Sequence, residues 1–229
     1  MTKEQEKIIE ELITEGTKRI QAPRNINPFE TGIPKAEELL NDLEHFPYIF
    51  VLACVMDRQI RTGRAWAIPY HVGKEIGGFE FSNFLKFNIN EIRTIFIKKS
   101  LHRFNEVMAK NFYLAIQDIH SKYNDNAANI WAGKPKSASV IRRFLEFKGV
   151  GIKIANMAAN ILARDFKIPM VDYSSIDIAP DVQVKRFFTH YGLLRKGGSK
   201  EELIYLAREI YPKYPGILDI AAWELGRKL

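Results

Sequence analysis

The chain has 229 residues, which is enough for one large domain or two small ones with a core that folds without disulfides. Hydrophobic residues make up 46% of it and charged residues 27%, and this composition excludes a wholly disordered protein. The formal net charge of +7 favours a polyanionic partner such as nucleic acid. No apolar run reaches the roughly 18 residues of a membrane span, and the polar start lacks the apolar core of a signal peptide. We therefore expect a cytoplasmic protein with no membrane partner.

Apolar residues recur at helical spacing almost throughout, and no alternating strand pattern or internal repeat is present. The first predicted helix begins after Thr2, which forms a capping box with Gln5, and three prolines within 22–34 mark an irregular connection. The very apolar segment 48–56 predicts a central buried helix that continues to about Arg61. The fold class is therefore all-α. The other helices are predicted at 35–44, 64–76, 90–97, 105–122, 137–147, 151–164, 181–191, 200–210 and 216–228, with caps at Asn105, Ser137 and Ser199.

The cysteine and histidine content limits the metal chemistry. Cys54 is the only cysteine, so a disulfide within the chain and a four-cysteine zinc or iron–sulfur site are excluded. It lies in the apolar segment 48–56, where a buried thiol that acts as a small hydrophobe is predicted. The five histidines show no paired metal spacing. We expect neither a metal nor a cofactor.

One turn between two predicted helices has the composition of an anion-binding site. An apolar helix leads into Gly149-Val150-Gly151, and the next helix starts at once. The two glycines permit positive φ angles and close approach of another backbone. The new helix points unpaired N–H groups and its positive dipole end outward, and Lys148 and Lys153 flank the turn, so phosphate is the natural anion. The alternative is a glycine turn between two ordinary packed helices.

A second motif surrounds Asp181. Pro180 and Asp181 begin a predicted helix whose apolar face includes Val184 and Phe187. An aspartate at the start of a helix is commonly just its N-cap. Only together with the glycine turn does Asp181 indicate a role beyond helix capping.

Together the two motifs resemble those of the helix-hairpin-helix/Gly-Pro-Asp superfamily of DNA glycosylases, and most closely of its endonuclease III-like branch. The segment 147–156 is similar to the hairpin of that branch, and 180–186 is similar to the segment that carries its essential aspartate. The segment 218–227 looks like the last helix before the branch's metal loop. The resemblance covers residues 46–227, and it implies a two-lobed helical fold with a central cleft. The expected lobes are a helical barrel that contains the hairpin, at 46–164, and a second helical lobe, at 1–45 plus 165–229.

The resemblance also implies roles for residues that would contact DNA. It assigns Gly149-Val150-Gly151 and Lys148 to phosphate binding. It maps the glutamine that fills the gap left by a flipped base onto Gln59, although Gln59 fits equally well as a polar residue at the end of a buried helix. Leu101-His102-Arg103 is placed as a loop that wedges into the duplex, with an ordinary helix connection as the alternative. Phe166 or Tyr173 is a candidate for stacking on a flipped base.

The resemblance makes Lys153 the nucleophile and Asp181 the essential carboxylate. Lys148 stands where the branch has proline, and the spacing from Lys153 to Asp181 is longer, so the non-helical stretch 165–180 carries an insertion. Asp172 within that stretch is a rival for the carboxylate role. The sequence favours Asp181, because Val-Gln-Val-Lys-Arg-Phe follows it in the family pattern. The four cluster cysteines of the branch are absent.

The resemblance implies a DNA glycosylase with AP-lyase activity on damaged double-stranded DNA. We expect a monomer that is nucleoid-associated if the source is prokaryotic. Lys153 lies in the first helical turn, where the positive dipole end disfavours the ammonium form and so favours nucleophilic attack on the sugar C1′. The alternatives are a monofunctional glycosylase that uses Asp181 and water, and a non-catalytic DNA-binding protein. A further alternative, an RNA-binding protein, is supported only by the positive net charge. An oxidised pyrimidine is the expected lesion, and 8-oxoguanine is the alternative. A mismatched thymine or uracil is expected less than either.

Overall fold

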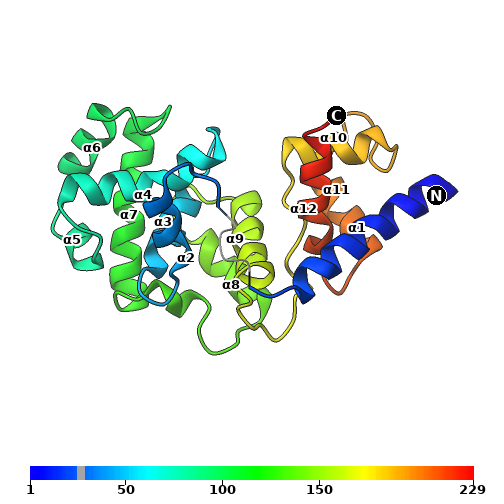
Figure 1. The fold of residues 1–229 in the computed structure, drawn as a ribbon, viewed down its shortest axis with the longest axis horizontal. Coiled ribbons are helices and arrows are strands. Elements are labelled where there is room, and N and C mark those ends of the chain that lie inside the picture. Colours follow the sequence, from blue (N-terminus) through cyan, green and yellow to red (C-terminus); the bar gives the residue numbers. More distant parts are fainter. Residues whose placement is uncertain (25–28) are drawn as a thin grey trace. The chain divides into compact units, whose positions relative to one another are not determined.

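The computed structural model describes residues 1–24 and 29–229 (Figure 1), and every regular element within these two ranges is a helix. The predicted all-α class is confirmed. Contacts between Cα atoms divide the chain into two units. The first comprises Met1–Asn25, Gly133–Arg142 and Gly151–Leu229, and the second comprises Ile26–Ala132 and Arg143–Val150.

The second unit is built around helix α3 (Pro47–Met56), whose ten residues are all buried. Pro47 fits the first turn, where its missing N–H would have no partner in the helix anyway. The helix is apolar on all sides and must therefore be central, and α4 (Thr62–Ile76) and α7 (Asn105–Tyr123) pack against it (Figure 1). Cys54 is buried, as predicted. The unit also contains α2 (Pro34–Asn41), α5 (Phe81–Leu85), α6 (Ile89–Lys98) and the short 3-10 helix η1 (Ala127–Ile130).

Helix α3 ends at Met56, earlier than the sequence predicts. Asp57 caps it, and Gln59 adopts a left-handed backbone conformation with φ of 55°. A left-handed residue interrupts the helical hydrogen-bond pattern, and apolar periodicity carries no signal for it. The prediction of one helix as far as Arg61 is therefore wrong, and Gln59 stands in the connection to α4.

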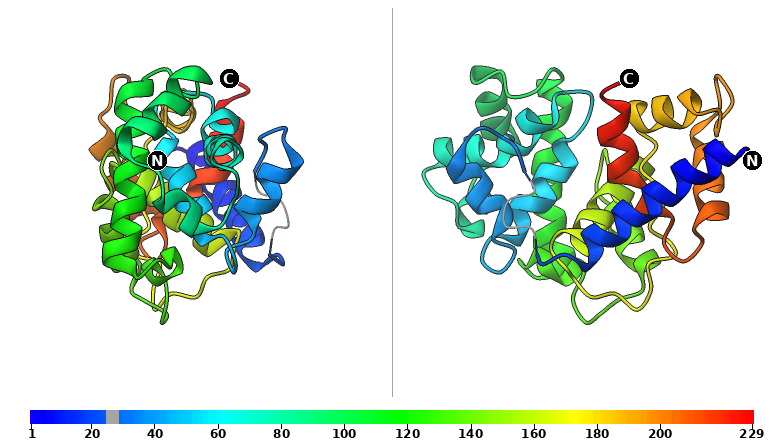
Figure 2. Two further views of the ribbon diagram at one scale, coloured as in Figure 1. Left: turned by 90° about the vertical axis from the view of Figure 1, so that its left-hand side faces the viewer. Right: turned by 45° about the vertical axis from the view of Figure 1, so that its right-hand side comes forward.

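The first unit gathers helices from both ends of the chain. Helix α1 (Lys3–Gln21) runs beside the C-terminal helix α12 (Asp219–Gly226), as Figures 1 and 2 show. Helix α10 (Val182–His190) packs tightly on α12 because Gly226 lacks a side chain: a Cβ there would lie 2.1 Å from the Gln183 carbonyl oxygen. The unit also contains α9 (Ile152–Arg164), α11 (Lys200–Ile210), the 3-10 helix η2 (Pro215–Leu218) and the first part of α8 (Ser137–Leu145).

The N-cap residues predicted from the sequence can be compared with those in the structure one by one. The predicted capping box of Thr2 is present at the start of α1, and Ser199 caps α11 in the same way. The cap predicted at Asn105 is wrong, because Phe104 is the N-cap residue of α7. The Asn105 side-chain oxygen accepts a hydrogen bond from the backbone N–H of His102 (2.8 Å) and so holds the preceding loop.

The stretch 165–180 is non-helical, as predicted, and polar side chains fix it. The ammonium of Lys167 donates to the carbonyls of Arg19 and Ile20 at the end of α1, each at 2.8 Å. Further along, Asp177 forms a bidentate ion pair with Arg208 of α11 (2.7 and 2.8 Å). The stretch is therefore an ordered connection that reaches the start of α10.

The two units differ from the expected lobes, 46–164 and 1–45 plus 165–229. Helix α9 groups with the first unit, and residues 29–45 group with the second. The reason is packing: α9 bonds through Asn160 to the backbone of Gly216 (2.8 Å) and also packs on α1, while α2 packs on α3 and α4.

Candidate active site

Lys153 and Asp181 lie side by side in the first unit. The Lys153 Nζ is 3.6 Å from the Asp181 Oδ2, and the two side chains are 33% and 25% exposed. Lys153 is the second residue of α9, and Asp181 is the N-cap of α10, where its side chain accepts a hydrogen bond from the Gln183 N–H (3.0 Å). A partly exposed lysine beside a carboxylate is therefore held by the first turns of two helices.

Asp172, the rival carboxylate, has other partners. Its Oδ1 accepts hydrogen bonds from the hydroxyls of Ser137 (2.6 Å) and Ser174 (3.0 Å) and from the Ser174 N–H (3.2 Å). These bonds, led by that of Ser137, lower the pKa of Asp172. Asp172 thus ties the stretch 165–180 to the start of α8, and the carboxylate paired with Lys153 is Asp181.

The glycine turn has the backbone that the sequence predicts. Gly149 has a φ of 93°, and Gly151 is the N-cap of α9 with an extended backbone. No side chain caps the first turn of α9, which leaves its leading N–H groups available to an anion. Lys148 and Gly151 are exposed, while Gly149 and Val150 are half-buried.

The two glycines of the turn should differ in their tolerance of alanine. A Cβ on Gly149 would be strained by the positive φ and would lie 2.4 Å from the buried Asn111 Nδ2, whereas a Cβ on Gly151 would meet nothing within 4 Å. We expect Gly149→Ala to lower the free energy of unfolding by about 1–3 kcal/mol and the matched control Gly151→Ala to change it by less than about 0.5 kcal/mol. Urea unfolding measures both. Equal stability of the two variants would contradict this assignment of the turn.

Gln59 and the predicted wedge loop are in the second unit. Gln59 is exposed in the α3–α4 connection, and His102 is close to the same connection, at the backbone of Met56 and Arg58. Burial lowers the pKa of His102, which is only 1% exposed, while that backbone raises it. His102 therefore supports the α3–α4 connection from within.

The exposed part of the wedge loop lies one residue further along than predicted. Leu101 and His102 are buried, whereas Arg103 and Phe104 are exposed. The Arg103 guanidinium lies 4.9 Å from the centre of the Phe104 ring. Sequence reasoning missed Phe104, although an aromatic residue next to an arginine is a known composition for stacking on bases.

The two aromatic candidates for base stacking are both engaged. Phe166 is buried, and Arg24 lies over its ring at 5.3 Å. Tyr173 is half-buried and stacks on Tyr214, with ring centres 5.1 Å apart. Both rings are therefore already packed against a neighbouring side chain.

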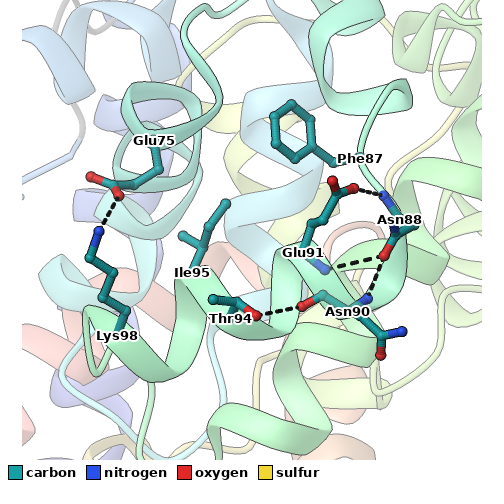
Figure 3. A pocket seen from close by; sticks show the side chains of 8 residues that line it. All are labelled: Glu75, Phe87, Asn88, Asn90, Glu91, Thr94, Ile95 and Lys98. Atoms are coloured by element: carbon teal, nitrogen blue, oxygen red, sulfur yellow. Dashed lines mark hydrogen bonds and ion pairs between the residues drawn. The ribbon is translucent and has the colours of Figure 1, made fainter.

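A surface pocket of about 390 Å³ lies in the second unit between α4 and α6 (Figure 3). Its polar groups are bonded to one another: Asn88 and Glu91 form the capping box of α6, and Glu75 pairs with Lys98 (3.8 Å). Among the described residues, no group of three or more histidine, cysteine or acidic side chains is placed to hold a metal. In the same residues, no helix combines the length and the apolar character that crossing a membrane requires.

Comparison with solved structures identifies the fold. No protein-family model matches the chain, and no curated protein matches it in sequence. The chain is similar to a trapped covalent intermediate of endonuclease III with DNA, at a TM-score of 0.61 and 18% identity, over 100% of this chain and 87% of that one. It is also similar to MBOgg1 in complex with a low-affinity DNA ligand, at a TM-score of 0.59 and 15% identity, over 86% of this chain and 68% of that one. The predicted resemblance is confirmed at the level of structure: the chain has the endonuclease III fold and is structurally similar to helix-hairpin-helix DNA glycosylases over most of its length.

Proposed function

We propose that the protein is a DNA glycosylase with AP-lyase activity that removes a damaged base from duplex DNA. The observation that carries the proposal is the pairing of Lys153 and Asp181, 3.6 Å apart and partly exposed, on the fold of proteins solved with DNA. The net charge of +7 supports a polyanionic substrate. The damaged base must leave the stacked duplex before its sugar can react.

The proposed reaction uses two groups of this chain, the Lys153 amine and the Asp181 carboxylate. The neutral Lys153 amine attacks the sugar C1′, the bond from C1′ to the base breaks, and the base leaves with the bonding electrons and takes up a proton. The Asp181 carboxylate stabilises the positive charge that develops at C1′. Loss of the amine proton and opening of the sugar ring give a Schiff base. Removal of a C2′ proton then expels the 3′ phosphate, and water releases the sugar fragment and restores Lys153.

A non-catalytic DNA-binding protein is the competing function. Phosphate binding requires cations and N–H donors but gains nothing from a carboxylate, because an aspartate beside the lysine repels the phosphate. The position of Asp181 against Lys153 therefore favours chemistry over simple binding. A monofunctional glycosylase, in which Asp181 activates water, would keep the carboxylate but need no attack by Lys153.

A panel of duplexes tests the proposal, each duplex carrying a single oxidised pyrimidine, 8-oxoguanine, mismatched thymine or uracil. We expect base release from an oxidised-base duplex, an oxidised pyrimidine first, and none from the undamaged control. Strand cleavage after release indicates the lyase step, and release without cleavage indicates the monofunctional alternative. Tight binding to all duplexes, with no base released and no abasic site cut, would instead establish a non-catalytic DNA-binding protein.

Gln59→Ala should separate base excision from strand cleavage. Gln59 is exposed on the α3–α4 connection and is proposed to fill the gap that a flipped base leaves. Its removal should slow excision by about tenfold, since unstacking a base costs a few kcal/mol, but should change cleavage of a preformed abasic site less. Gln117→Ala on α7 of the same unit is the control, with both rates unchanged. Single-turnover rates on both substrates measure the effect, and equal slowing of the two reactions would count against gap filling.

A further inference from the structure

A buried polar face runs along α9 behind Lys153. Lys153, Asn156, Asn160 and Arg164 recur at helical spacing, so they lie on one side of the helix. Asn156 and Asn160 are buried, which is costly for amide groups unless they are hydrogen-bonded. The Asn156 side-chain oxygen accepts the Asp177 N–H at 2.7 Å. The face therefore continues inward from the partly exposed lysine as a set of bonded polar groups.

Asn160 connects this face to Asp219, the first residue of α12. Its Nδ2 donates to the Gly216 carbonyl (2.8 Å) and approaches the Asp219 Oδ2 at 3.4 Å. The Tyr214 hydroxyl donates to the Asn160 Oδ1 at 2.5 Å and so fixes which way the amide points. Asp219 is only 9% exposed. A carboxylate is thus held in the interior by an amide that neighbouring groups orient.

The charges that act on Asp219 come from α9 and from the start of α10. Burial raises the pKa of Asp219 to about 6, while the charges of Arg164 and Lys153 and the Asn160 hydrogen bond lower it, and the charge of Asp181 raises it. Arg164 is itself bonded to the carboxylate of Asp165 (2.6 and 3.1 Å). From α1, Arg19 pairs with Glu224 at 2.7 Å, at the other end of α12. Asp219 is therefore electrostatically coupled to both members of the Lys153–Asp181 pair.

We propose that Asp219 is a positioning residue for Lys153, whose charge sets how tightly the amine holds its proton in the reaction proposed above. Coupling between two titrating groups is mutual: if the lysine charge favours ionised Asp219, ionised Asp219 favours the ammonium form of Lys153. Protonation of Asp219 then releases Lys153 toward the neutral amine. Asp219 acts from the interior, so it tunes the amine without touching the substrate.

The test measures the proton affinity of Lys153 without DNA. The protein is labelled briefly with acetic anhydride between pH 5 and 11, and mass spectrometry gives the fraction of Lys153 acetylated at each pH. We expect Asp219→Asn to move the midpoint of this profile to lower pH, as loss of an opposite charge predicts. Glu224→Gln is the control, because it removes a charge from the same helix whose partner is Arg19, and its midpoint should stay at the wild-type value. An unchanged Asp219→Asn midpoint, or an equal shift in Glu224→Gln, would overturn the proposal.

A second measurement covers the case that Asp219→Asn does not fold. In Lys153→Met, loss of the cation should move the titration of the Asp219 carboxyl carbon, followed by NMR, to higher pH. The Lys153 side chain is partly exposed, so this variant should retain the fold. An Asp219 titration that does not move in Lys153→Met would overturn the coupling.

The pH profile of Schiff-base formation connects the inference to function. We expect the rising limb of the trapping rate on an abasic duplex to move to lower pH in Asp219→Asn, in step with the labelling midpoint. A labelling shift in a protein that traps no DNA would support the role of Asp219 toward Lys153 and overturn the lyase proposal. Trapping in the wild type with no labelling shift in Asp219→Asn would support the lyase proposal and overturn the role of Asp219 toward Lys153.

Discussion

Lys153→Ala is expected to abolish strand cleavage at an abasic site, with a fall in rate of at least about 1,000-fold. The substitution removes the only proposed nucleophile, and alanine has no group that can form the Schiff base. Gel analysis of a duplex with one abasic site, under single-turnover conditions, measures the loss. Affinity for the duplex should fall by less than about tenfold, because one phosphate contact is a small part of the electrostatic binding.

The neighbouring lysine provides the matched control for that variant. Lys148 is exposed on the same turn, so Lys148→Ala removes an equal charge but leaves the Lys153 amine in place. We expect Lys148→Ala to weaken DNA binding and to cut bound DNA at close to the wild-type rate. Cleavage by Lys153→Ala at the wild-type rate would refute the role assigned to Lys153.

Asp181→Asn is expected to slow base excision by about 100- to 10,000-fold. The asparagine keeps the shape and can still accept the Gln183 N–H at the start of α10, so the helix should remain. What is lost is the negative charge that lies 3.6 Å from Lys153, which we propose stabilises the positive charge that develops at C1′. Single-turnover release of the damaged base measures the effect.

Asp172→Asn tests whether Asp172, rather than Asp181, is the essential carboxylate. Asp172 bonds to Ser137 and Ser174, so the substitution should loosen the stretch 165–180 and lower stability while sparing the excision rate. The opposite result, in which Asp172→Asn is inactive and Asp181→Asn is active, would transfer the carboxylate role to Asp172.

The sequence predicts most of the helices because each has an apolar face or a recognisable cap. The capping boxes of Thr2 and Ser199 and the buried helix at 48–56 are clear local signals. The end of that helix is not predictable in this way, because it depends on the left-handed conformation of Gln59, a residue with no special preference for it. The elements that sequence reasoning missed, such as α5 (Phe81–Leu85), are too short to show a helical period.

The pairing of Lys153 with Asp181 is predictable because each residue belongs to a motif with its own spacing. Asp219 belongs to neither motif. Its one signal is a carboxylate placed between apolar Leu218 and Ile220, and whether such a group is buried depends on Asn160, which lies far away in the chain. Long-range polar contacts of this kind leave no periodic pattern. The support of the Lys153 site is therefore visible only in three dimensions.

Borohydride trapping on a duplex with one abasic site tests the central claim most directly. Reduction fixes any Schiff base as a stable bond between protein and DNA, and mass spectrometry of the digested adduct identifies the lysine that carries it. We predict one adduct, on the peptide that contains Lys153, which is absent in Lys153→Ala and present in Lys148→Ala. An adduct on another lysine, or none from a wild-type protein that binds the duplex tightly, would contradict the account.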